Sequence, residues 1–99
     1  VKRLSRSSAA ARDRIAAEVR DAYSAWAAAF EQSSQTQTNV ELARLLEEAE
    51  QVLFDRGAAD LLALQIRELA TFEARVLEVD AITEFFRAQA DYNVATGRR

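Results

Sequence analysis

Carboxylates are the most numerous side chains that could do chemistry in this 99-residue sequence, which has 16 acidic and 13 basic residues and no His or Cys. The missing residue types exclude a Cys/His zinc site, a disulfide, a cysteine nucleophile and a His-dependent triad. A di-iron site in a helical bundle would need Glu-x-x-His, and two glycines cannot form a phosphate-binding loop. Acidic residues cluster at Glu47, Glu48 and Glu50 and at Glu78 and Asp80, where solvated helix faces are expected. We therefore expect no catalytic residue, no metal, no cofactor and no enzyme activity.

The charge balance also narrows the class of partner. A formal charge of −3 argues against nucleic-acid binding, which usually shows a basic excess. No apolar run approaches the roughly 18 residues of a transmembrane helix.

We expect residues 1–8 to fray ahead of an N-cap at Ser7 or Ser8. The alternative is that Lys2, Arg3 and Arg6 contact phosphate or lipid headgroups. The Val1 start and the Gly97-Arg98-Arg99 end suggest a fragment of a longer protein.

Composition and periodicity predict an all-α fold. The sequence has no Pro, two Gly and 21 Ala, too few turn residues for an all-β or doubly wound fold. Apolar residues spaced by three or four predict a first helix over about residues 9–54; they begin with Ile15, Val19, Ala22, Trp26 and Phe30. Residues 32–39 are polar and could form a loop, with Asn39 capping a new helix. The absence of Gly and Pro there favours a continuous helix.

The two glycines stand where helices should end. Gly57 predicts a turn over residues 55–59, after which Asp60 caps a second helix over about residues 60–96, and Gly97 ends it. The second helix carries a stripe typical of the contact face of a coiled coil: Leu62, Ile66, Leu69, Phe72, Val76, Val79, Ile82, Phe86 and Ala90. The whole chain is predicted to form one long antiparallel helical hairpin.

Such a hairpin has more apolar surface than it can bury. Each helix can cover one stripe against the other, yet several apolar residues of the second helix lie off its main stripe: Leu61, Leu64, Leu77, Phe85 and Tyr92. On the first helix, Tyr23, Trp26 and Phe30 should form a packed aromatic patch rather than a ligand cage. We therefore expect the hairpin to pack laterally against further helices or copies.

The turn lies in a recognisable sequence context. The segment 53–64 (LFDRGAADLLAL), followed by Arg67-Glu68-Leu69 and closed by residues 90–92 (ADY) and 95–97 (ATG), resembles the C-terminal repeat of TolC-type outer-membrane efflux proteins. The upstream segment 14–23 (RIAAEVRDAY) is similar to the start of the descending helix in that family. The resemblance covers nearly the whole chain.

The resemblance implies a specific assembly. Members are trimeric tubes with a β-barrel in the outer membrane of Gram-negative bacteria and an α-helical barrel in the periplasm. This chain would be one periplasmic hairpin of that helical barrel, and membrane contact would come only through the β-barrel it lacks. The turn would be the tip that docks a periplasmic adaptor (membrane fusion) protein, which couples the channel to an inner-membrane pump for efflux or type I secretion. The docking residues would be Arg56, Gly57, Asp60, Leu61 and Leu62.

The sequence departs from the family at two positions and leaves other readings open. Many members have Asp where this chain has Ala63 and Ile66, which places an acidic ring in doubt. The main alternative is a soluble helical-bundle module for protein–protein interaction, such as a dimer with four helices. A remaining alternative is an enzyme with a site in a bundle core.

Overall fold

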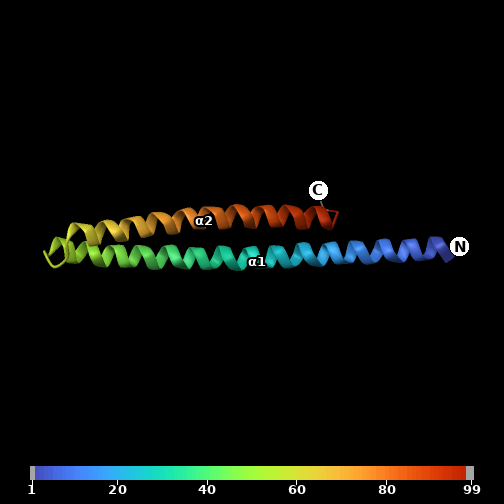
Figure 1. Ribbon diagram of the computed structural model, residues 1–99, viewed down its shortest axis with the longest axis horizontal. Coiled ribbons are helices and arrows are strands. Elements are labelled where there is room, and N and C mark those ends of the chain that lie inside the picture. The colour runs from blue at the N-terminus through green and yellow to red at the C-terminus, as the bar shows by residue number, and fades with distance from the viewer. Residues whose placement is uncertain (1, 98–99) are drawn as a thin grey trace.

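Two long helices account for nearly all of the described chain. The computed structural model describes residues 2–97, with side-chain exposure from Arg6 onward. Helix α1 spans Lys2–Asp55 and helix α2 spans Leu61–Ala95, and no strand occurs within residues 2–97. The helices lie side by side and antiparallel, joined by one short turn (Figure 1). The predicted all-α helical hairpin is confirmed.

Helix α1 continues without a break through its polar segment, as favoured from the sequence. The hydroxyl of Thr36 donates to the carbonyl of Ser33 at 2.9 Å, and that of Thr38 donates to the carbonyl of Ser34 at 3.2 Å. These side chains are accommodated by bonding to the helix's own backbone, so they do not interrupt it.

The start of α1 differs from the prediction, because the helix begins at Lys2 rather than near residue 9. Ser7 and Ser8 lie inside the helix and do not cap it. Alanine and arginine on either side have high helix propensity, which carries the helix through the serines. Val1, Arg98 and Arg99 lie outside the described residues, as do the side chains of Lys2 and Arg3.

The described chain is a rod. Its extents are 84 × 20 × 15 Å and its radius of gyration is 22.9 Å, against about 13 Å for a compact domain of this length. Helix α1 is 54 residues long and α2 is 35, so α1 continues past the C-terminal end of α2 (Figure 1). A folded-back compact bundle of one chain is not what the structure adopts.

The two helices meet along a seam, which we define by the buried and half-buried residues that recur every three and four positions. On α1 these are Val19, Ala22, Trp26, Ala29, Ser33, Thr36, Val40, Ala43, Glu47, Glu50 and Phe54. On α2 they are Leu64, Arg67, Thr71, Ala74, Glu78, Ala81, Phe85, Ala88, Tyr92 and Ala95. This 3.5-residue period is that of a left-handed coiled coil.

Small side chains dominate the buried part of the seam. The buried residues in the described part are Ala29, Thr36, Leu64, Thr71, Ala81 and Ala88, each 4–8% exposed. Alanine and threonine let two helix backbones approach closely, because little side-chain volume separates them. The hydroxyl of Thr71 donates to the carbonyl of Arg67 at 3.1 Å, so this buried polar group is satisfied within its own helix. The seam therefore fixes a close approach while burying little apolar area.

The large apolar stripe of α2 does not face α1, which corrects the expectation from the sequence. Leu62, Phe72 and Phe86 are 65%, 64% and 60% exposed, whereas Leu64 is 4% exposed. An α-helix turns by about 100° per residue. Measured around the axis of α2, roughly 155° separates the seam from a second line of residues, which consists of Leu62, Leu69, Phe72, Val76, Val79 and Phe86. We call these six residues the outer face of α2. The reason for the error is that both faces of α2 repeat every 3.5 residues, and the face with the larger side chains is the one turned outward.

Enlarging an alanine in the seam should force the helices apart. We expect Ala81→Leu to lower the free energy of unfolding by about 1–3 kcal/mol, because added methyl groups overpack a closed contact. The matched control is Ala90→Leu, which places the same substitution at an exposed position of the same helix. Urea unfolding followed by circular dichroism measures both. Equal stability of the two variants would contradict close packing along the seam.

Candidate functional site

The turn between the helices is held by a hydrogen-bonded C-terminal cap. The N–H of Ala58 donates to the carbonyl of Leu53 at 2.8 Å, and the N–H of Gly57 donates to that of Phe54 at 3.0 Å. This pair of bonds defines a Schellman motif, whose penultimate residue adopts the left-handed conformation. Gly57 has φ +75°, as the sequence predicted for a helix stop. Gly97 has φ +77° just after the end of α2, which confirms the second stop.

Asp60 begins α2 as its N-cap. Its Oδ1 accepts a hydrogen bond of 2.8 Å from the N–H of Ala63, and its backbone is extended with φ −89° and ψ 167°. The carboxylate satisfies one of the free N–H groups in the first turn and faces the positive end of the helix dipole. Capping by Asp60 is confirmed, and the turn spans residues 56–60 rather than 55–59.

The five residues predicted for a docking tip lie together at the turn end of the rod. Arg56, Gly57 and Asp60 are exposed in the turn itself. Leu61 and Leu62 open α2 with 52% and 65% of their surface exposed. Val52 and Leu53 of α1, which the sequence analysis did not select, are also exposed there. We call residues 52–62 the tip, a rigid bend that presents leucine side chains beside one arginine.

Gly57 is constrained by its backbone conformation and not by space. A Cβ added there would meet nothing within 4 Å, so a substitution acts through the positive φ alone. We expect Gly57→Val to lower the free energy of unfolding by about 1–3 kcal/mol. Gly57→Asn should cost less, because asparagine tolerates the left-handed region. Thermal melts with Ala58→Val as control check this, and a Gly57→Val chain as stable as wild type would contradict it.

The outer face of α2 is an apolar surface that α1 does not cover. Each of its six residues is at least 44% exposed. The accessible surface of the chain is 7890 Å², whereas a compact monomer of the same mass exposes about 5,600 Å². The excess of about 2,300 Å² equals the total area of a large stable protein–protein interface. The predicted shortage of core is confirmed: large apolar side chains are exposed on this face and also on α1, at Ile15, Leu42, Leu45, Leu46, Val52 and Leu53.

Six aromatic side chains gather where the end of α2 packs on α1. Tyr23, Trp26 and Phe30 come from α1; Trp26 is half-buried, whereas Tyr23 and Phe30 are each 56% exposed, so the predicted patch is only partly packed. The α2 contribution was not foreseen: the ring of Trp26 stacks on Tyr92 at 4.9 Å, and Phe85 lies 6.0 Å from Phe30. Phe86 adjoins Phe85 at 5.5 Å. We call these six residues the aromatic cluster; the register of the hairpin, which follows from the position of the turn, brings them together.

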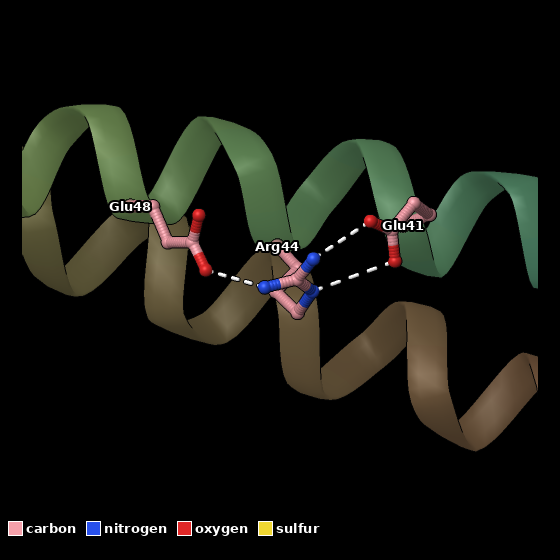
Figure 2. Close-up of polar contacts among 3 residues, drawn as sticks. All are labelled: Glu41, Arg44 and Glu48. Atoms are coloured by element: carbon pink, nitrogen blue, oxygen red, sulfur yellow. Dashed lines mark hydrogen bonds and ion pairs between the residues drawn. The ribbon is translucent and has the colours of Figure 1, made fainter.

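Charged side chains of α1 form one network on its surface. Arg44 donates to Glu41 at 2.7 Å and also pairs with Glu48, so one guanidinium bridges successive turns (Figure 2). All three side chains are substantially exposed, which limits what the network adds to stability. Its geometry is that of a helix surface pairing at i,i+3 and i,i+4.

The hydrogen bond from Arg44, followed by its positive charge, lowers the pKa of the Glu41 carboxyl below its ordinary value. A lowered folded-state pKa stabilises the helix above the unfolded pKa, and that contribution is lost as the pH falls through the folded pKa. We expect Arg44→Gln to raise the Glu41 pKa toward its ordinary value in a carbon-detected NMR titration. Arg87→Gln, which removes the partner of Glu84, should leave Glu41 unchanged. No movement of the Glu41 pKa in Arg44→Gln would refute the pairing.

The acidic clusters do not assemble a metal or acid–base site in the described part of the chain. Glu48 and Asp80 are exposed, as expected for solvated faces, but Glu47, Glu50 and Glu78 are half-buried along the seam. Within residues 2–97, no group of three or more acidic side chains converges to bind a metal ion. Neither described helix contains a stretch long and apolar enough to span a bilayer.

Comparison with known proteins finds no relative of this chain. No protein-family model, no curated protein and no solved structure matches the chain.

Proposed function

We propose that this chain is a structural hairpin in the wall of a TolC-like periplasmic channel for efflux or type I secretion, with no catalytic role. The observation that carries the proposal is the outer face of α2, where large apolar side chains point away from the only helix available to cover them. A rod of 84 Å with one closed seam, an open apolar face on α2 and exposed leucines on α1 at positions 42, 45, 46 and 53 has apolar surface that neighbouring helices of a wall would cover.

The tip supplies the second part of the proposal. The capped turn holds Leu61 and Leu62 at the extreme end of the rod, where a partner can reach them without disturbing the seam. The proposed partner is a periplasmic adaptor protein that couples the channel to an inner-membrane pump. The resemblance of residues 53–64 to the TolC-type C-terminal repeat supports this partner, together with a periplasmic location below the outer membrane and a trimeric full-length protein.

Self-association of the chain tests the proposed lateral packing of hairpins in a channel wall. We expect the chain to associate with a micromolar dissociation constant in sedimentation equilibrium, and Phe72→Glu to weaken that association at least tenfold by placing a charge on the outer face. Gln35→Glu adds the same charge at an exposed position of α1 and should leave association unchanged. A monomer at all concentrations would refute lateral packing, and a closed dimer of four helices would favour the soluble interaction module.

Cross-linking at the tip tests the partner. A photo-reactive amino acid at Ala58, in cells that express the protein, should capture a periplasmic adaptor identified by mass spectrometry. The matched position is Gln35, far along the rod, which should not capture it. Leu62→Asp should abolish capture while helix content is retained, because the leucine is largely exposed. Capture of a protein of another class, or none, would refute adaptor docking.

A further inference from the structure

The aromatic cluster borders an open groove that neither the seam nor the tip explains. Four rings line it, those of Tyr23, Trp26, Phe30 and Phe85. Its volume is about 540 Å³, and the two alanines between the α1 rings, Ala27 and Ala28, leave that space because of their size. Sites for small organic ligands typically occupy about 300–1,000 Å³. The groove is therefore of the size of a ligand site.

The groove carries charge of one sign only. The only side chain charged at neutral pH that lines the groove, within the described residues, is the carboxylate of Glu31. The groove on the outer face of α2 differs, because Arg75 and Asp80 both line it and their charges offset each other. Aromatic ring faces attract cations through their quadrupole, and a carboxylate at the same site adds to that attraction.

The indole N–H of Trp26 does not alter this preference. The Nε1–H of Trp26 is buried and has no hydrogen-bond partner among the described residues. Because it is inaccessible, it cannot donate to an anion or carbonyl in the groove. Four aromatic rings and one negative charge line the groove.

The geometry points to a binding site for a lipophilic organic monocation, such as a quaternary ammonium or phosphonium ion with aromatic or alkyl groups. The apolar part of such a ligand lies against the rings, and its charge lies beside Glu31 and the ring faces. The groove is formed within a single hairpin, so this inference does not depend on assembly or on the proposed channel function.

Two ions of the same shape and opposite charge test the site. Trp26 is the only tryptophan of the chain, so its fluorescence reports on the groove directly. We expect tetraphenylphosphonium to bind the full chain saturably and at least tenfold more tightly than tetraphenylborate. Equal affinity for the two ions would show simple apolar adsorption and overturn the proposal. Absence of binding by either ion would overturn it as well and would indicate a surface reserved for another helix.

Matched variants assign the affinity to the groove. Glu31→Gln removes the charge at constant volume and should weaken tetraphenylphosphonium binding about fivefold, whereas Glu73→Gln on α2 should not. Phe30→Leu keeps an apolar side chain but removes the ring and should weaken binding at least fivefold. Phe72→Leu makes the same change at a similarly exposed ring outside the groove and is the control. Circular dichroism verifies the fold of each variant, and unchanged affinity in both Glu31→Gln and Phe30→Leu would refute the site.

Discussion

A close contact between two helices through small side chains governs the rest of this structure. Alanine and threonine occupy most of the buried positions of the seam, so the backbones approach closely but exclude little apolar surface from water. Apart from Leu64, Phe85 and Tyr92, the large aliphatic and aromatic residues of α2 then have no place between the helices. They form a second face with the same 3.5-residue period, turned away from α1. The shape of the rod and its unsatisfied apolar area are two consequences of this one arrangement.

The turn makes that arrangement possible without weakening either helix end. The Schellman bonds at Gly57 satisfy carbonyls of α1, and the Asp60 carboxylate satisfies an N–H of α2. Helix termini otherwise leave several backbone groups without partners. Because the caps are made by residues 53–63 themselves, the bend is independent of the rest of the rod. The side chains of its exposed leucines take no part in these hydrogen bonds.

Local rules predicted most of the backbone from the sequence. Gly57, Asp60 and Gly97 act through the chemistry of a few neighbouring residues, and all three were placed correctly. Continuity through residues 32–39 also followed, because nothing there breaks a helix. The predicted start of α1 was wrong, because serine inside a run of good helix formers is tolerated as readily as serine at a cap.

The contact face of each helix and the register of the hairpin were harder to predict, because they depend on which surfaces of α1 and α2 meet. Hydrophobic periodicity identified a stripe on α2, but bulk was taken as a sign of burial within the hairpin. Leu64 and Ala81 on one face and Leu69 and Phe72 on the other satisfy the same spacing. The α2 half of the aromatic cluster was missed for a related reason: the contact of Tyr92 with Trp26 joins residues far apart in sequence, and only the position of the turn sets their pairing.

The aromatic cluster has a mechanical role that follows from its place on the rod. Trp26 lies roughly 45 Å from the turn along α1, near the level where α2 ends at Ala95. Between these two points the seam consists largely of small and polar residues, which resist sliding weakly because few large side chains interlock. The covalent turn fixes the register at one end, and the stacking of Trp26 on Tyr92 fixes it at the other. A hairpin fastened at both ends can keep its outer apolar face straight over the length between them, which is what lateral packing in a wall of helices requires.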